Sequence, residues 1–147
     1  MEIITFYSKN KPYFWLTNFQ YATFYDNDGK KWTTSEHYFQ AQKFIKTKPE
    51  YAETIRLSSS PWKAKTLGKS KIYPIDEKWE EIKVNKMKEA VYLKFTRNKT
   101  MKEKILLTGD SILVLMSGDP FWGVAGLNML GCILMEVREE IRKESYN

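Results

Sequence analysis

Glu36, Gln40 and Lys43 stand four and seven residues apart in a run that reads as one amphipathic helix. Because a helix has about 3.6 residues per turn, the three side chains fall on one stripe. A carboxylate, an amide and an ammonium on one stripe can present themselves to a single ligand. A positioned glutamate can move a proton, and a lysine can supply charge or, when neutral, attack a carbonyl.

A second polar segment lies far along the chain. Asp119 would supply a second acid, and Trp122 a ring that stacks on a flat heterocycle. Gly123 would let the backbone approach a phosphate or a sugar, and Asn128 would either bind a ligand or cap the last helix. Two acids from distant segments are what a site assembled by folding requires.

Each of these residues also has a structural interpretation. Thr33 and Glu36 fit a capping box as N-cap and N3, which explains the glutamate without chemistry. Lys43 could be a solvated surface lysine, and Asp119 a turn residue before proline. On spacing alone the structural interpretations are favoured. The single histidine, His37, is expected to be a structural residue.

Composition restricts the classes of ligand and of site. The net charge of +6 favours anionic ligands such as phosphates, nucleotides or nucleic acid. No block of Lys and Arg residues forms a tail that would bind a polyanion. Aromatic residues make up 15% of the chain, which suits a ring-rich core or a stacking pocket. One cysteine, Cys132, allows no intrachain disulfide, and no residues have metal-ligand spacing. We therefore expect no metal and no cofactor.

No apolar run approaches the roughly 20 residues of a membrane span, and the N-terminus lacks a signal-peptide pattern. The expected protein is a cytoplasmic monomer. Its 147 residues are most simply a single domain, 1–147.

The hydrophobic pattern predicts an α+β fold, predominantly helical, with a small N-terminal β-hairpin region and a short buried strand. Expected strands are 3–7, 21–25, 31–33 and 112–116, and expected helices are 33–46, 49–57, 61–68, 76–98, 100–109 and 127–145. Asn27-Asp28-Gly29 is the hairpin turn, Ser60 and Thr100 are expected N-caps, and 69–74 is a basic loop.

Three blocks of sequence resemble the NADAR family, which includes riboflavin-biosynthesis-intermediate N-glycosidases. The resemblance covers nearly the whole chain, and its most specific part is the run Ser-Glu-His-Tyr-Phe-Gln-Ala-Gln-Lys. The chain departs from the family at Leu115, where a glutamate is common, and at Asp76, where an arginine is common. The matching blocks are residues 15–19 with 29–44, then 59–61, Ala64 and 67–69 with Trp79, Met87 and 93–95, and finally Asp119, 122–123, Asn128, 130–131 and 134–138.

The resemblance implies cleavage of an N-glycosidic bond. Substrates would be phosphoribosylaminopyrimidine intermediates of riboflavin synthesis, or ADP-ribosylated guanine, in which case ADP-ribosylated nucleic acid would be a partner. Carried over, Glu36, Lys43 and Asp119 are the expected catalytic residues. For Glu36 and Lys43 the resemblance reverses the interpretation from spacing alone. The expected substrate-binding residues are Asn18, Phe19, Tyr38, Phe39, Gln40, Lys69, Lys71, Trp79, Trp122, Gly123 and Asn128.

Breaking an N-glycosidic bond builds positive charge on the ribose and negative charge on the departing base. Glu36 and Asp119 would share the tasks of stabilising the first and protonating the second. Lys43 would act either as an ammonium or, when neutral, through a Schiff base with the opened sugar. Two alternatives remain: a non-catalytic module that binds ADP-ribose or a nucleotide, and a basic nucleic-acid-binding protein that rests on net charge alone.

Overall fold

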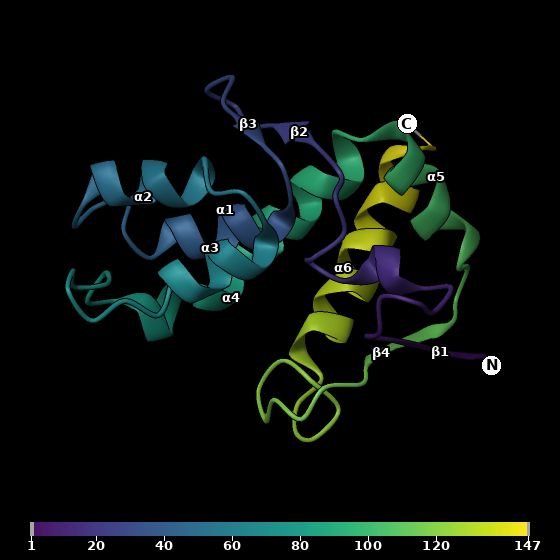
Figure 1. The fold of residues 1–147 in the computed structure, drawn as a ribbon. Helices are drawn as coiled ribbons and strands as arrows, with labels where there is room; N and C mark the ends of the chain where they lie inside the picture. The colour runs from purple at the N-terminus through teal and green to yellow at the C-terminus, as the bar shows by residue number, and fades with distance from the viewer. Residues whose placement is uncertain (1, 147) are drawn as a thin grey trace.

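The structure, a computed structural model, describes residues 2–146, which form mainly helices with four short strands (Figure 1). The expected α+β, predominantly helical class is confirmed. In chain order the elements are β1 (Ile3–Phe6), η1 (Phe14–Leu16, a 3₁₀ turn), β2 (Phe24–Tyr25), β3 (Lys31–Trp32), α1 (Ser35–Gln42), α2 (Pro49–Arg56), α3 (Pro61–Leu67), α4 (Trp79–Thr96), α5 (Lys99–Leu107), β4 (Ile112–Leu115) and α6 (Met129–Glu144).

Helix α4 joins two groups of elements, because it contacts α1 on one side and α6 on the other. In Figure 1, α1, α2 and α3 lie together at the left, and α5, α6 and the β1–β4 pair lie at the right. Strands β1 and β4 are parallel, with Ile3 opposite Ile112 and Phe6 opposite Leu115. Since parallel strands end at the same edge, the segments that follow β1 and β4 are brought together although they are distant in sequence.

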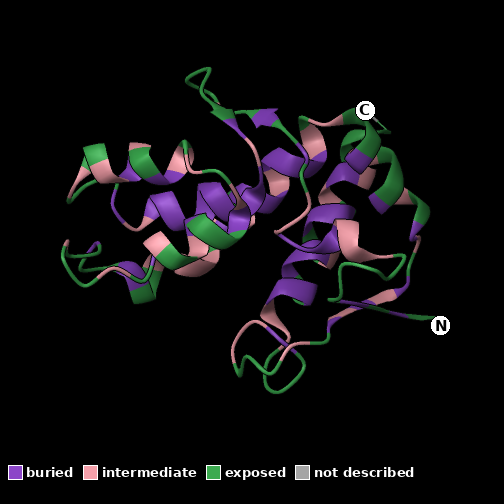
Figure 2. Cartoon of the chain, in the orientation of Figure 1, coloured by how far each residue is buried: buried purple, intermediate pink, exposed green. Residues whose placement is uncertain are grey.

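Helix α1 is buried along its whole length (Figure 2). Its N-cap is Thr34, whose Oγ1 accepts a hydrogen bond from the His37 backbone N–H at 3.1 Å. The expected cap, Thr33, is therefore wrong by one residue. Its carbonyl accepts from the Ala22 N–H, which keeps Thr33 in the extended segment. Glu36 then lies at N2 of the helix, and its side chain is not required for a capping box.

His37 is a structural residue, as expected. Its Nδ1 lies 2.7 Å from Thr34 Oγ1 and its Nε2 3.1 Å from the Ser58 carbonyl oxygen. Burial lowers the pKa of His37, so the neutral ring is favoured. The imidazole fixes the start of α1 against the segment that leads into α3.

Four other expected helix boundaries differ in the structure. Helix α1 ends at Gln42 rather than at residue 46. Helix α4 begins at Trp79 because Asp76 Oδ1 accepts from the Lys78 N–H, and the Asp76 N–H donates to the Lys43 carbonyl. Asn98, not Thr100, caps α5 by accepting from the Met101 N–H. Helix α6 starts after Asn128, whose φ of 47° interrupts the helix.

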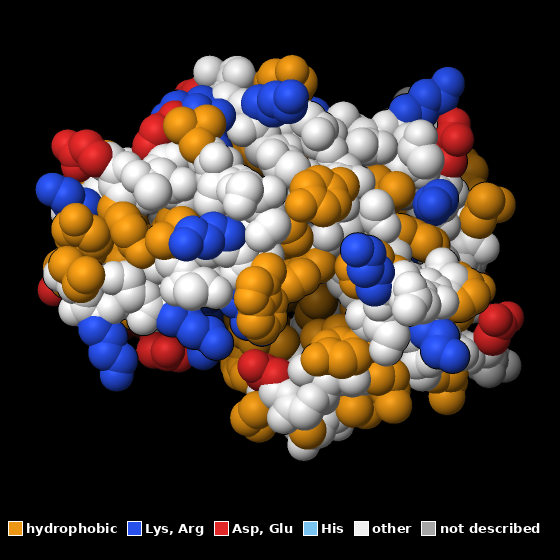
Figure 3. Space-filling view, in the orientation of Figure 1, with side chains coloured by type: hydrophobic (Ala, Val, Ile, Leu, Met, Phe, Trp, Pro, Cys, Tyr) orange, Lys and Arg blue, Asp and Glu red, His pale blue; other side chains and the backbone are white. Residues whose placement is uncertain are grey.

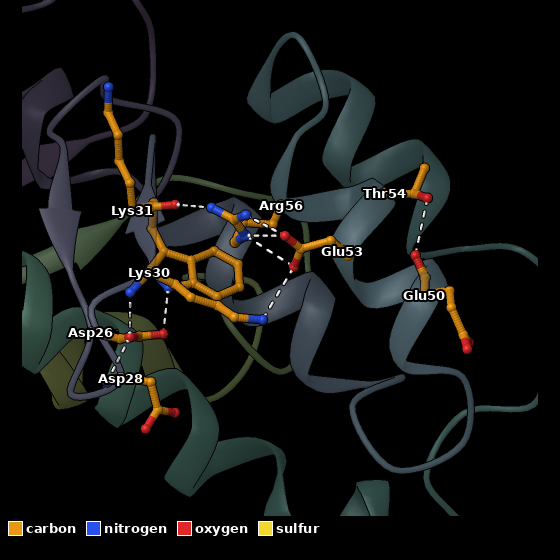
Figure 4. A network of polar contacts seen from close by, with 9 residues as sticks. Asp26, Asp28, Lys30, Lys31, Glu50, Glu53, Thr54 and Arg56 are labelled. Atoms are coloured by element: carbon orange, nitrogen blue, oxygen red, sulfur yellow. Dashed lines mark hydrogen bonds and ion pairs between the residues drawn. The ribbon is translucent and has the colours of Figure 1, made fainter.

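The expected hairpin forms between β2 and β3, although only Phe24 and Tyr25 of the expected first strand pair. Asp26 Oδ2 accepts from the Trp32 indole N–H at 2.9 Å. Asp26 Oδ1 accepts from the Lys30 backbone N–H (Figure 4). Arg56 on α2 donates to Glu53 and to the Lys31 carbonyl, and its hydrogen bond lowers the pKa of Glu53 to about 2. Arg56 therefore ties the hairpin to α2.

Lys94 lies in the core with none of its surface exposed. Its Nζ donates to the carbonyl oxygens of Trp15 and Thr17, both at 2.8 Å. No salt bridge to Lys94 is found among residues 2–146. Burial lowers the pKa of Lys94 to about 7. A neutral amine keeps two N–H donors, one for each of these two carbonyl oxygens. Lys94 therefore ties η1 and the residue that follows it to α4.

The stability of the protein is expected to depend on pH through Lys94. The folded state binds the proton only below about pH 7, whereas the unfolded chain holds it up to about pH 10.5. Unfolding free energy should therefore rise between these values, by at most about 1.4 kcal/mol per pH unit for this one group. Denaturant titrations at pH 7 to 9 measure this gain as the difference in unfolding free energy between wild type and Lys94→Met. A difference that stays constant with pH would show that Lys94 is charged in the folded state.

Candidate active site

A cleft of about 650 Å³ opens between the two groups of elements. The space-filling view shows a hollow with hydrophobic side chains around it and an acidic side chain at its edge (Figure 3). The segments that follow β1 and β4 meet at this cleft, as the parallel pairing requires. Its lining residues are Tyr7, Ser8, Lys9, Phe14, Thr17, Asn18, Phe19, Glu36, Phe39, Gln40, Lys43, Trp62, Lys65, Trp79, Glu80, Lys83, Met87, Leu115, Ser117, Asp119, Trp122 and Leu130.

One face of α1, together with Lys43 directly after it, lines the cleft with the predicted stripe. Glu36, Gln40 and Lys43 all lie there, with Phe39 beside them. Gln40 Nε2 donates to Glu36 Oε1 at 2.8 Å, and both side chains are buried. The amide thus holds the carboxyl group in place. Gln40 Oε1 is buried and has no hydrogen-bond partner among the described residues.

Burial raises the pKa of Glu36 above its ordinary value. The Gln40 hydrogen bond and the charges of Lys65, Lys43 and Lys69 oppose this effect, but desolvation is the largest cause. The protonated carboxyl is therefore populated at a higher pH than in water. A carboxyl group of this kind is suited to donate a proton to a leaving group.

The Lys43 ammonium lies at the other end of the stripe. Its Nζ donates to the Gly68 carbonyl at 3.3 Å and lies 5.9 Å from the centroid of the Trp79 ring. Burial lowers the pKa of Lys43, and the repulsion of Lys69 adds to this, whereas the charge of Glu36 raises it. Desolvation outweighs the carboxylate, so the neutral amine is more accessible than in a surface lysine.

Three aromatic rings form one wall of the cleft. Phe39 contacts both Trp79 and Trp122, with ring centroids 5.2 and 5.5 Å apart. Trp79 is buried and Trp122 half-buried. A flat heterocycle can lie against such a wall within reach of the α1 stripe.

Asp119 lies at the edge of the cleft and matches both interpretations of the sequence, a turn residue and an acid at the cleft. Its Oδ1 accepts from the backbone N–H groups of Phe121 and Trp122, both at 2.8 Å, which makes it a turn residue. The side chain nevertheless lines the cleft and is exposed to solvent. Folding therefore brings it to the same cleft as Glu36, as a second acid.

Asn18 and Phe19 also line the cleft, as expected. Asn18 Oδ1 accepts from Ser35 Oγ at 2.8 Å, and its Nδ2 lies 3.2 Å from Met87 Sδ. Asn18 therefore fixes the segment after η1 to the start of α1.

Five expected substrate-binding residues lie outside the cleft lining. Tyr38 points away and donates to Glu89 Oε1 at 3.0 Å, and the Asn128 amide accepts from the Leu115 N–H and donates to the Leu113 carbonyl. A side chain at Gly123 would meet the Ser117 backbone, so its small size serves loop packing. Lys69 and Lys71 are exposed on the loop after α3. For Tyr38, Asn128 and Gly123, contacts within the fold account for the residue type.

Several lining residues were not predicted from the sequence, of which Trp62 and Lys65 on α3 stand out. Their spacing of three residues places both on one face of the expected helix, but only the fold shows that this face borders the cleft and leaves the Trp62 ring exposed. Leu115, one of the two departures from the family pattern, also lines the cleft.

Gly68 is expected to position the Glu36–Gln40 pair. A Cβ at residue 68 would overlap the Gln40 amide, and the Gly68 carbonyl accepts from Lys43. Gly68→Ala should displace Gln40 and lower kcat by roughly tenfold, since a small displacement of a reacting group is costly. Steady-state kinetics measure the effect, with Gly118→Ala as a control, because a Cβ there meets no atom within 4 Å. Equal kcat in both variants would contradict this role.

Among residues 2–146, no three His, Cys, Asp or Glu side chains are grouped to hold a metal ion. No helix within the same residues is long and apolar enough to cross a membrane.

Comparison with known proteins identifies the family. The NADAR domain model matches residues 5–142. N-glycosidase YbiA of Escherichia coli is 40% identical over 147 residues, which cover 97% of this chain and 90% of that protein. N-glycosidase Npun_R5314 of Nostoc punctiforme is 40% identical over 145 residues, covering 95% and 92%. The riboflavin biosynthesis protein PYRR of Zea mays is 37% identical over 123 residues, covering 75% of this chain and 20% of that protein.

The fold agrees with these matches. The NMR structure of E. coli YbiA superposes with a TM-score of 0.87 at 38% identity, covering 99% of this chain and 88% of that one. The relatives named as N-glycosidases, together with the shared fold, define the class of this protein as a hydrolase of N-glycosyl bonds. The chain belongs to the NADAR family. The expected resemblance is confirmed.

Proposed function

We propose that this N-glycosidase cleaves the bond between phosphoribose and an aminopyrimidine of the kind found in riboflavin synthesis. The observation that carries the proposal is the α1 stripe, where Glu36 and Lys43 open into one cleft beside the rings of Phe39 and Trp79. The maize relative matched above is named as a riboflavin biosynthesis protein, which supports this substrate class.

The size and lining of the cleft fit a ligand of this kind. Its volume of about 650 Å³ lies in the range of small-molecule sites, roughly 300–1,000 Å³. Lysines supply charge for a phosphate, and the aromatic wall supplies a surface for the heterocycle. ADP-ribosylated guanine is the second candidate, and it would extend from the same cleft into solvent.

The reaction divides between the two acids. Protonated Glu36 donates its proton to the leaving nitrogen as the glycosidic bond breaks. The Asp119 carboxylate stabilises positive charge at the ribose C1 and accepts a proton from the attacking water. The products are free base and ribose 5-phosphate. The raised pKa of Glu36 supports its assignment as the acid, and the exposure of Asp119 supports its access to water.

Asp119→Asn is expected to lower kcat by roughly 10²-fold, the scale of one positioned acid or base. The asparagine keeps an oxygen for the N–H groups of Phe121 and Trp122, so the loop should remain folded. Asp119→Ser serves as a comparison that also shortens the side chain. If Asp119→Asn retains full activity with an unchanged melting temperature, Asp119 is a turn residue alone.

The function is tested by incubating the purified protein with each substrate class in the presence of EDTA. Chromatography detects free aminopyrimidine from the phosphoribosyl substrate and free guanine-containing product from the ADP-ribosylated one. Release from the first and not from the second is the expected result. Preferential cleavage of ADP-ribosylated guanine would replace the proposed substrate. Tight binding of either substrate without turnover would favour the binding module.

A further inference from the structure

The ammonium of Lys65 lies beside two aromatic rings at the cleft. Its Nζ is 5.9 Å from the ring centroids of both Phe19 and Trp62. The two rings meet edge to face at 6.3 Å, and Trp62 is 66% exposed. An exposed tryptophan beside a lysine at the wall of a cleft is available to a ligand.

Of the other three lysines that line the cleft, Lys43 and Lys83 have polar partners. Lys43 donates to the Gly68 carbonyl, and Lys83 forms an ion pair with Glu80 at 2.5 Å. Lys9 lies on the exposed segment after β1. For Lys65 no ion pair to a carboxylate is found within residues 2–146, and the rings restrict where its charge can lie. Its charge is therefore directed to the cleft and available for an anion.

We propose that Lys65, flanked by Phe19 and Trp62, is the phosphate subsite of this cleft and binds the 5′-phosphate of the ribosyl substrate. The inference rests on the proposed function, and it assigns the phosphate to Lys65 instead of to Lys69 and Lys71, two of the expected substrate-binding residues. The aromatic rings limit the rotamers of the lysine, which reduces the entropy lost on binding. They also shield the ammonium partly from water, which strengthens its attraction for a phosphate dianion.

Phosphate at this subsite also affects Glu36. Lys65 has the largest effect of any charged residue on Glu36, whose pKa it lowers. A bound phosphate dianion neutralises that effect, so the carboxyl group stays protonated when phosphorylated substrate occupies the cleft. The subsite thereby couples recognition of the phosphate to the readiness of the acid.

Calorimetric titration with ribose 5-phosphate tests the subsite without turnover. Lys65→Gln should weaken binding roughly tenfold or more, since hydrogen bonds to charged groups are the strong ones. Lys63→Gln removes an equal charge from an exposed position on the same helix and should bind as wild type does. Lys65→Arg, which keeps the charge, should restore most of the affinity, and melting temperatures confirm that each variant is folded.

Equal affinity in wild type and Lys65→Gln would overturn the subsite, as would equal losses in Lys65→Gln and Lys63→Gln. Wild-type protein that binds ribose 5-phosphate no more tightly than ribose would overturn it as well. Base release by the wild type is scored separately. If no substrate is hydrolysed but Lys65 still governs ribose 5-phosphate binding, the proposed function fails and the subsite stands.

Discussion

Glu36→Gln is expected to lower kcat by roughly 10²-fold or more, because glutamine cannot donate the proton that the leaving base requires. The substitution keeps the shape of the side chain and a hydrogen-bonding group next to Gln40. In wild type, kcat should fall as pH rises through the raised pKa of Glu36, since only the protonated form acts. Steady-state rates across pH 5 to 9 measure both effects, and the variant should lack that dependence.

The stability of Glu36→Gln separates catalysis from structure. A carboxyl group whose folded pKa is raised favours folding below its unfolded pKa, and this contribution is lost as pH rises through the folded value. Above that window the glutamine variant should be at least as stable as wild type. A variant that unfolds, yet keeps its activity per folded molecule, would show that Glu36 is a structural residue.

Lys43→Met is expected to reduce kcat by roughly 10²-fold or more, because it removes both the charge and the amine. Lys43→Arg distinguishes the two possible roles. If a neutral Lys43 amine adds to C1 of the ring-opened glycoside and the base leaves as its free amine, Lys43 forms an imine that a guanidinium cannot form, and water then hydrolyses this imine to release ribose 5-phosphate. The lowered pKa of Lys43 favours this route. Lys43→Arg should then be as inactive as Lys43→Met.

Borohydride added during turnover gives an independent measurement. It reduces an imine to a stable secondary amine, so mass spectrometry should find a ribose phosphate adduct on the Lys43 peptide. An active Lys43→Arg protein, together with a peptide that carries no sugar-derived mass, would assign Lys43 an electrostatic role.

The polar stripe on α1 was predictable from sequence because its period is local. Residues four and seven apart share a face wherever a helix forms, and Glu36, Gln40 and Lys43 do so here. The cap was not predictable to the residue, since Thr33 and Thr34 can both accept a hydrogen bond. The choice between them depends on Thr33 pairing with the distant Ala22.

Two loop residues show why a sequence pattern alone does not distinguish a structural residue from one that lines the cleft. Asn128 and Asp119 are both polar residues near glycines, yet Asn128 binds the β4 backbone and Asp119 reaches the cleft. Trp62 and Lys65 face the cleft only because α3 packs against α1. Such placements depend on contacts between segments, which spacing along the chain does not encode.

The location of the site is tested most directly by the indole N–H signals of the five tryptophans in a ¹H–¹⁵N NMR spectrum. The protein is titrated with the two products, ribose 5-phosphate and free aminopyrimidine, and Trp→Phe variants assign each signal. Trp62, Trp79 and Trp122 line the cleft, whereas Trp32 is bound to Asp26 and Trp15 lies at a separate, smaller cavity. Shifts at Trp62, Trp79 and Trp122, with Trp15 and Trp32 unchanged, are the predicted result. Shifts confined to Trp15 would contradict the assignment of the α1 cleft as the site of glycosidic cleavage.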